Sequence, residues 1–167
     1  MPAFFVAQYG VSLQASAKLS LAPWVACAVV SSLAGVVADS AARMPGMTLT
    51  RVRKFAQCGS FLGTALCLTV LGTATDPRVA MACFVGSFAS ISLGQAGFVA
   101  NTSDVAPPRL VGRLFGLANT FGSFAGILST SLAGYLGFEW IFKVTALVLV
   151  GGAAFYARFA SAERAIA

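Results

Sequence analysis

Between Arg78 and Asp104 the sequence reads VAMACFVGSFASISLGQAGFVANTS, a run of 25 residues without a single charge. A helix that crosses the hydrocarbon core of a bilayer needs about 20 mostly apolar residues. Lipid offers no hydrogen-bond partner to an open sheet edge, so we expect this run to cross as a helix. The stretch therefore predicts a membrane-spanning helix and sets the fold class expected for the whole chain.

Four similar runs surround this stretch. Uncharged runs of 20, 21 and 25 residues follow Lys18, Lys54 and Arg113. A final run of 14 residues follows Lys143, and it reaches spanning length if residues 140–142 are added and Lys143 extends toward the interface. We therefore predict an all-α membrane protein with five transmembrane helices, at about 19–40, 52–72, 78–102, 112–136 and 139–159.

The first 17 residues are also uncharged, but they contain Pro2, Gln8, Gly10 and Gln14. A signal peptide would begin with positive charge, which this segment lacks. We predict that residues 1–17 are the end of a truncated transmembrane helix followed by a polar turn around Tyr9–Ser16. Residues 18–167 are then a C-terminal transmembrane bundle.

The composition argues against a soluble enzyme or a nucleic-acid-binding protein. Charged residues make up 10% of the chain, where a soluble domain carries about 25%. The chain has no histidine, and no acidic or basic residue falls in the middle of a predicted span. An integral membrane enzyme is therefore disfavoured as well, and we predict no catalytic residue, no metal site, no cofactor and no nucleic-acid partner.

The basic residues are distributed unequally between the two ends of the predicted helices. Eight lie on one side: Arg43, Arg51, Arg53, Lys54, Arg109, Arg113, Arg158 and Arg164. Three lie on the other: Lys18, Arg78 and Lys143. Basic residues concentrate on the cytoplasmic side of membrane proteins, so we predict a cytoplasmic C-terminus.

Small residues recur at four-residue spacing and are typical of close helix packing in membranes. The clearest examples are Gly86, Gly94, Gly122 and Gly126. A moving interface between helices is the alternative, and the glycines alone do not decide between the two.

Three amide side chains fall within the predicted spans, namely Gln95, Asn101 and Asn119. An amide inside a bilayer needs a partner or water. These three residues are candidates either for interhelical hydrogen bonds or for the lining of a substrate cavity.

The stretch GVVADSAAR, Gly35–Arg43, followed by the basic cluster RVRK at residues 51–54, resembles the loop signature of the major facilitator superfamily. In this pattern Gly35, Asp39 and Arg43 are the motif positions. Gly35 permits close approach, Asp39 is suited to the positive N-terminus of a neighbouring helix, and Arg43 is suited to an ion pair within the loop.

A second stretch, NTSDVAPPRLVGRLFGLANTFGSFAGI at residues 101–127, resembles the NHxD(I/L)AP…GxLxGxxNTxGxxAG segment of the anion:cation symporter family. The matching positions are Asn101, Asp104, Ala106, Pro107, Gly112, Leu114, Gly116, Asn119, Thr120, Gly122, Ala125 and Gly126. Two features depart from the pattern: Thr102 replaces the usual histidine, and the double proline Pro107-Pro108 lengthens the turn by one residue.

The resemblance implies the last five helices of a twelve-helix transporter, preceded by the end of a further helix. It also implies alternating access for a phosphate or carboxylate anion coupled to Na⁺ or H⁺. The expected partners are the lipid bilayer, the small anion, and a missing N-terminal six-helix half or its equivalent. The alternative is a non-transporting membrane subunit derived from such a transporter, and the coding sequence upstream of Met1 would distinguish the two. Plasma membrane, vesicle and plastid envelope all occur as locations in the resembled family.

Overall fold

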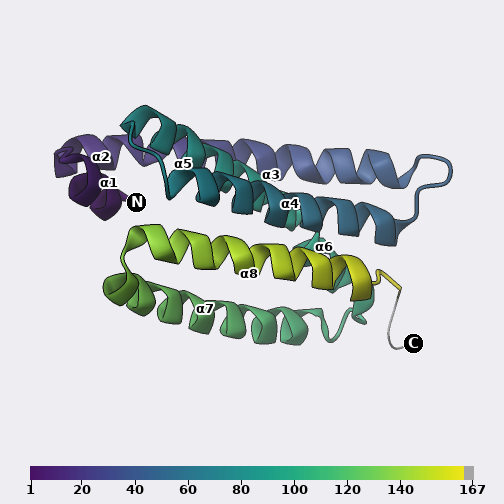
Figure 1. Cartoon of the computed structure of the whole chain (residues 1–167). Coiled ribbons are helices and arrows are strands. Elements are labelled where there is room, and N and C mark those ends of the chain that lie inside the picture. The colour runs from purple at the N-terminus through teal and green to yellow at the C-terminus, as the bar shows by residue number, and fades with distance from the viewer. Residues whose placement is uncertain (164–167) are drawn as a thin grey trace.

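The computed structural model describes residues 1–163 and builds them almost entirely from helices (Figure 1). The elements are α1 (Pro2–Tyr9), α2 (Leu13–Leu19), α3 (Leu21–Ala42), α4 (Leu49–Leu71), α5 (Pro77–Ser92), the 3₁₀ turn η1 (Leu93–Gln95), α6 (Phe98–Val105), α7 (Val111–Leu136) and α8 (Phe138–Phe159). No strand occurs in the described residues, so the predicted all-α fold class is confirmed.

Four helical segments are long and apolar enough to cross a membrane by length and composition. They cover Leu13–Ala42, Leu49–Leu71, Pro77–Val105 and Phe138–Phe159. Helix α7 has 26 residues, but its many glycine, serine and threonine residues lower its hydropathy, and it is not among the four. The predicted span at 112–136 is therefore helical, and its crossing of the membrane stays a prediction.

The helix ends gather at two opposite ends of the bundle. Figure 1 places the α3–α4 loop, the α6–α7 turn and the C-terminal segment at one end, and the N-terminus at the other. The predicted basic side corresponds to the first of these ends, although Arg164 lies outside the described residues. Which end faces the cytoplasm stays a prediction.

Local sequence signals set several of the helix boundaries. The Thr48 hydroxyl accepts a hydrogen bond from the Arg51 backbone N–H at 3.3 Å and begins α4. The Asp76 carboxylate accepts one from the Arg78 N–H at 2.8 Å, with Pro77 in the first turn of α5. Such caps satisfy backbone donors that a helix start otherwise leaves unpaired.

The N-terminal segment differs from its prediction in the length of its turn. Helix α1 ends at Tyr9 and is capped by Gly10, whose φ of 62° is the left-handed conformation that glycine adopts most easily. Residues 13–19 are already helical, because the Ser12 side chain accepts from the Ala15 N–H at 3.3 Å and caps α2. The polar turn is therefore confined to residues 10–12, and its predicted extension to Ser16 was wrong.

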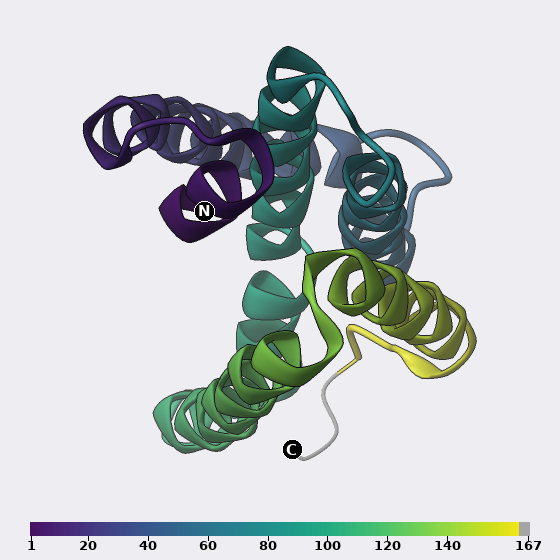
Figure 2. The same ribbon diagram turned by 60° about the vertical axis from the view of Figure 1, so that its left-hand side comes forward.

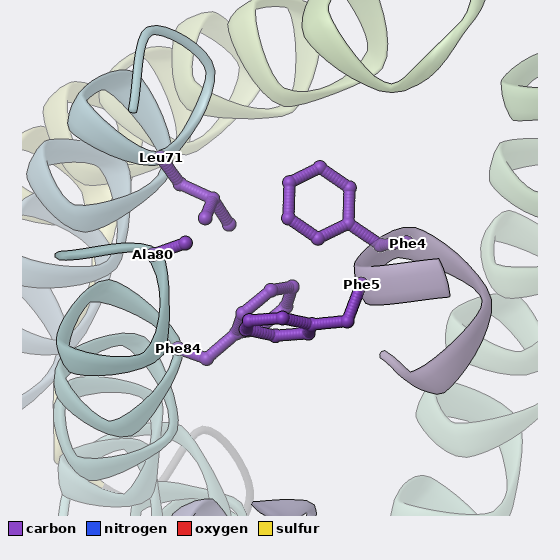
Figure 3. Packing of buried hydrophobic residues seen from close by; sticks show 5 residues of the cluster. All are labelled: Phe4, Phe5, Leu71, Ala80 and Phe84. Carbon is purple, nitrogen blue, oxygen red and sulfur yellow. The ribbon is translucent and has the colours of Figure 1, made fainter. Parts of the chain in front are cut away.

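A cluster of large side chains holds α1 against the bundle (Figure 3). Phe4 and Phe5 pack with Leu71 of α4 and with Ala80 and Phe84 of α5. The Tyr9 hydroxyl, at the end of α1, also donates to the Ala74 carbonyl at 2.7 Å. Aromatic edge-to-face contacts and this hydrogen bond fix the short helix at the N-terminal end of the bundle.

Helix α8 lies between α4 and α7 in both views (Figure 2). Gly152 faces the Phe61 ring of α4, where an added Cβ would lie 3.4 Å from the nearest ring carbon. Helix α7 has no buried residue, and its apolar side chains, including Phe121, Phe124 and Ile127, are exposed in the described structure. The bundle is therefore tightest around α4 and most open along α7.

Candidate functional site

The span predicted at 78–102 falls within one candidate membrane-spanning segment, Pro77–Val105, and the helix is interrupted near the last third of that segment. Helix α5 ends at Ser92, a 3₁₀ turn follows, and Gly97 departs from helical geometry with a ψ of −100° before α6 begins. A Cβ on Gly97 would lie 2.7 Å from Gln57 Oε1 and 2.8 Å from the Gln57 backbone nitrogen. The break therefore sits where the backbone of α4 approaches most closely, which only glycine allows.

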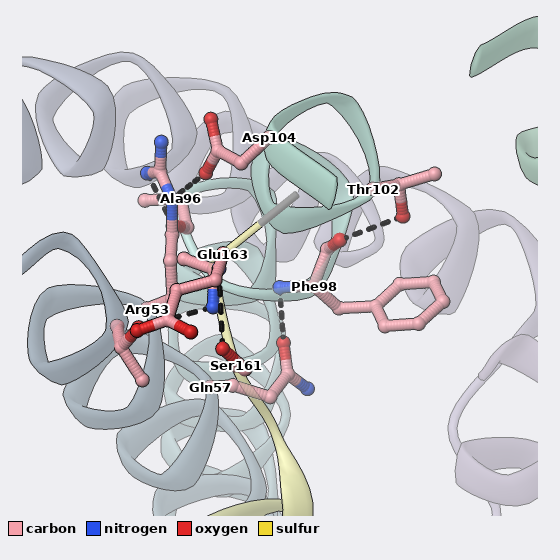
Figure 4. A network of polar contacts seen from close by, with 10 residues as sticks. Arg53, Gln57, Ala96, Phe98, Thr102, Asp104, Ser161 and Glu163 are labelled. Carbon is pink, nitrogen blue, oxygen red and sulfur yellow. Dashed lines mark hydrogen bonds and ion pairs between the residues drawn. The ribbon is translucent and has the colours of Figure 1, made fainter. Parts of the chain in front are cut away.

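Two side chains of α4 satisfy the backbone groups that the break releases (Figure 4). Gln57 Oε1 accepts a hydrogen bond from the Phe98 N–H at 2.8 Å. One turn earlier on α4, Arg53 donates from Nη1 to the Ala96 carbonyl at 2.8 Å. Residues four apart on a helix share a face, so the pair reaches both sides of the break. Backbone groups buried in a membrane need such partners.

The same arginine forms an ion pair across the helices. Arg53 Nε donates to Asp104 Oδ2 at 2.7 Å, and the side chains are 11% and 21% exposed. The contact joins residues 51 positions apart and locks α6 onto α4. In the sequence Arg53 counted only among the basic residues of one side, and Asp104 as the end of an uncharged run and a motif position, so the pairing was missed. Their opposite charges at predicted ends on the same side of the membrane were the available signal.

The C-terminal end of α8 is attached to the start of α4. Lys54 Nζ donates to the Ala157 carbonyl at 2.8 Å, and the Ala162 N–H donates to Thr50 Oγ1 at 3.0 Å. Together with Arg53, these contacts tie two helices, α6 and α8, to the first two turns of α4. The basic cluster at residues 51–54 is thus partly a structural clamp.

A pocket of about 490 Å³ opens between α6, α7 and α8. Its walls are mostly apolar and include Phe98, Phe121 and Phe155. Asn101 also lines it and is 9% exposed. The hydroxyl of Tyr156, another lining residue, is buried beside the Asn101 side chain and lies close enough to form a hydrogen bond with it.

The three predicted cavity amides do not share one pocket. Asn101 lies in the pocket just described, whereas Gln95 is exposed in η1 and Asn119 is exposed on α7. Asn101 is recognisable from the sequence as an amide within a span. Tyr156 is not, because a tyrosine near a helix end is ordinarily an interfacial residue.

The loop-motif residues lie on and just after the last turns of α3. Asp39 and Arg43 are both exposed, and Gly35 has open space where a Cβ would stand. The ion pairs within residues 1–163 are Arg53–Asp104 and Lys143–Glu139, so Asp39 and Arg43 do not pair there. Their conformational role stays a prediction.

The predicted packing glycines fall into two groups. A Cβ on Gly86 would lie 2.9 Å from Cys67 Sγ, and one on Gly94 would lie 3.4 Å from Ser60 Oγ, both on α4. These two glycines therefore let α5 and η1 approach α4 closely. Gly122 and Gly126 on α7 have no such neighbour within 4 Å in the described structure, and their role in packing stays a prediction.

Comparison with known proteins adds a family and several relatives. A family model described as Major Facilitator Superfamily matches residues 1–130. The chain is 35% identical to probable anion transporter 3, chloroplastic, of Oryza sativa subsp. japonica, over 98% of the chain and 32% of the relative. It is 32% identical to the chloroplastic ascorbate transporter of Arabidopsis thaliana, over 98% of the chain and 31% of the relative.

A third relative is sodium-dependent phosphate transport protein 1, chloroplastic, of Arabidopsis thaliana. The chain is 31% identical to it, over 99% of the chain and 33% of the relative. The chain thus spans about a third of the length of these curated relatives.

Proposed function

Because the chain belongs to the Major Facilitator Superfamily, we propose that it forms part of a membrane transporter that carries an organic or inorganic anion of the phosphate or carboxylate type. The observation that carries this proposal is its similarity, along 98–99% of its length, to proteins named as anion, ascorbate and phosphate transporters. A sodium-dependent protein among them supports coupling to a cation, Na⁺ or H⁺. Spans without a central acid or base favour a transporter over an enzyme.

Transport by alternating access requires two helical bundles that rock about a shared site. We propose that this chain supplies one bundle and that a six-helix half supplies the other. The share of the relatives' length that it spans supports this arrangement. The exposed apolar side chains of α7, such as Phe121 and Phe124, also favour contact with further helices or lipid.

The hydrogen bonds at the break hold α6 rigidly against α4. Arg53 and Gln57 bind α6 to α4 by two hydrogen bonds, and Arg53 makes a third to the Ala96 carbonyl just before α6. We propose that α4, α6 and the end of α8 move as one body. Gln95 and Asn119, which are exposed, are the candidate amides for the anion cavity. Asn101 suits that role less, because none of the residues 1–163 that line its pocket is charged.

We propose a multi-pass location with the basic end of the bundle, and so the C-terminus, in the cytoplasm or its equivalent. The eight-to-three distribution of basic residues supports this orientation. The chloroplast relatives make a plastid envelope one of the membranes to examine first.

Reconstitution in liposomes tests the proposal directly. The chain would be co-expressed with the part of the Arabidopsis sodium-dependent phosphate relative that it does not match, and uptake of phosphate and ascorbate measured under Na⁺ and pH gradients. The relative's own matching segment, supplied in the same way, is the control. We expect saturable, cation-dependent uptake by the combined proteins and none by the 167-residue chain alone.

Two outcomes would contradict parts of this reading. If the control pair transports an anion and the pair containing this chain does not, the transport proposal fails. If the chain alone transports, the need for a second bundle fails, and a transporter made of copies of this chain replaces it.

A further inference from the structure

Two cysteines lie close together where α4 packs against α5. Cys67 belongs to α4 and Cys83 to α5, and both are half-buried free thiols. A Cβ on Gly86 of α5 would lie 2.9 Å from the Cys67 sulfur, so this sulfur rests against the surface of α5. Cys83 stands three residues before Gly86, and side chains at this spacing are neighbours on one helix face, about 5–6 Å apart. Cys67 therefore reaches the part of α5 that carries Cys83.

The pairing of the two helices places both cysteines in one layer of the bundle. Two contacts between α4 and α5 lie on either side of them, namely Thr64 with Ser87 and Leu71 with Ala80. Cys67 is one helical turn from the α4 member of each contact, and Cys83 is one turn from each α5 member. The two sulfurs are also close enough for their charges to interact. The helices run in opposite directions, so the cysteines lie at the same level.

Small residues bring the two backbones close together beside this layer. A Cβ on Gly63, one turn before Cys67, would lie 3.0 Å from the Ser90 Cβ of α5. The two Cβ atoms of a disulfide are about 3.5–4.5 Å apart. The helices are therefore close enough here for a disulfide to join them.

The cysteines also lie near the end of the bundle that is opposite to the basic end. Cys67 is four residues before Leu71, the last residue of α4, and this spacing is about 6 Å along the helix. Cys83 is six residues after Pro77, the first residue of α5. The distribution of basic residues predicts that this end faces away from the cytoplasm. Disulfides persist in compartments outside the cytoplasm, where thiols are not kept reduced.

We propose that Cys67 and Cys83 form a reversible disulfide that fastens α4 to α5 under oxidising conditions. The oxidant is a small disulfide compound. One cysteine thiolate attacks a sulfur of this compound and releases a first thiol. The other cysteine then attacks the mixed disulfide, forms the Cys67–Cys83 bond and releases a second thiol. Two protein thiols are oxidised, one small disulfide is reduced to two thiols, and the two cysteine protons pass to those thiols.

The bond acts beside the cluster that holds α1 against the bundle. Cys83 packs against this cluster, in which Phe4 and Phe5 of α1 meet α4 and α5. A disulfide closes a loop in the chain and so restricts the unfolded state. The oxidised chain therefore resists unfolding better than the reduced chain. This role concerns the stability of the bundle and does not depend on the transport of an anion.

Peptide mapping of the full chain in detergent micelles tests the bond. The chain is treated with 2-hydroxyethyl disulfide and denatured, and the remaining thiols are blocked with N-ethylmaleimide. Trypsin cleaves after Lys54, Arg78 and Arg109, and it places the two cysteines in separate peptides, 55–78 and 79–109. We expect mass spectrometry to find these peptides linked in most of the oxidised chain. After reduction, both peptides should appear unlinked and blocked.

Four serine variants make the test specific. Cys67→Ser and Cys83→Ser should each abolish the link. Cys58→Ser removes the other cysteine of peptide 55–78 and should leave the link intact, and Cys27→Ser, on α3, is the matched control for losing a half-buried thiol elsewhere. Oxidation should raise the apparent melting temperature of the wild-type chain by several degrees, and it should not raise that of Cys83→Ser.

Three results would overturn the proposal. Peptides 55–78 and 79–109 that stay unlinked in the oxidised wild-type chain would mean that the two sulfurs do not meet. A link that persists in Cys67→Ser would make Cys58 the partner and contradict the packing argument. In a mixture of isotopically heavy and light chains, links between heavy and light peptides in statistical proportion would mean that the bond joins two copies of the chain.

Discussion

Replacing Arg53 with methionine should remove the polar contacts that hold the break between α5 and α6 against α4, while it keeps most of the apolar part of the side chain. The change removes the 2.7 Å hydrogen bond to Asp104 and the 2.8 Å bond to the Ala96 carbonyl. It leaves a carboxylate that is 21% exposed and a backbone carbonyl without partners. Hydrogen bonds to charged groups contribute about 1.5–3 kcal/mol each, and partial exposure of the carboxylate reduces the first. We expect a loss of about 2–4 kcal/mol in the free energy of unfolding.

The measurement is reversible unfolding of the chain in detergent micelles, followed by circular dichroism at increasing denaturant. A double-mutant cycle with Asp104→Asn separates the ion pair from the carbonyl cap, because only the ion pair is lost in both single variants. Arg53→Lys keeps the charge but lacks the planar fork that reaches both acceptors, so it should fall between wild type and Arg53→Met. A loss below about 0.5 kcal/mol for Arg53→Met, the level of an ordinary surface substitution, would refute the clamp.

Three further predictions concern other parts of the bundle. Gly97→Ala should lower the free energy of unfolding by about 1–3 kcal/mol in the same assay, because its Cβ would lie within 2.8 Å of α4 atoms. The control Gly116→Ala, where a Cβ would meet no atom within 4 Å, should not lower it. Equal effects of the two variants would contradict the close approach. Single cysteines at Ser40 and Ser103, in a background without the four native cysteines, should react with an impermeant maleimide only after cells are permeabilised, and labelling of intact cells would reverse the orientation. In a transporting assembly, Asp39→Asn should slow uptake with little change in apparent affinity, and a large rise in KM at normal turnover would make Asp39 a substrate ligand instead.

The positions of the long helices followed from the sequence because charge is excluded from the bilayer core. The runs after Lys18, Lys54 and Lys143 needed only a count of uncharged residues. The structure places helices at 21–42, 49–71 and 138–159, within a few residues of the expected bounds. Local caps such as Thr48 account for the differences, since they act on single turns that a count of charges does not detect.

The break at Gly97 could not be predicted from the distribution of charges along the sequence. Its cause is the approach of Gln57, which lies 40 positions earlier, and no local pattern encodes that distance. The Arg53–Asp104 pair is long-range in the same sense. In the pocket between α6, α7 and α8, Asn101 was recognisable as a costly residue in a span. The position of Tyr156 beside it depends on the packing of α6 against α8, which no local pattern encodes.

The clamp also bears on the order in which the chain enters the membrane. Ribosomes deliver α4 before α6, so the side chains of Arg53 and Gln57 are already in the bilayer when the broken helix arrives. The unpaired amide of Phe98 and the carbonyl of Ala96 then meet their partners during insertion and need not stay exposed to lipid. An interrupted helix of this kind is tolerated late in the chain because the hydrogen-bond partners of its backbone groups are inserted with an earlier helix. If the break preceded α4 in the sequence, its unpaired N–H and carbonyl groups would lie in hydrocarbon until α4 was synthesised.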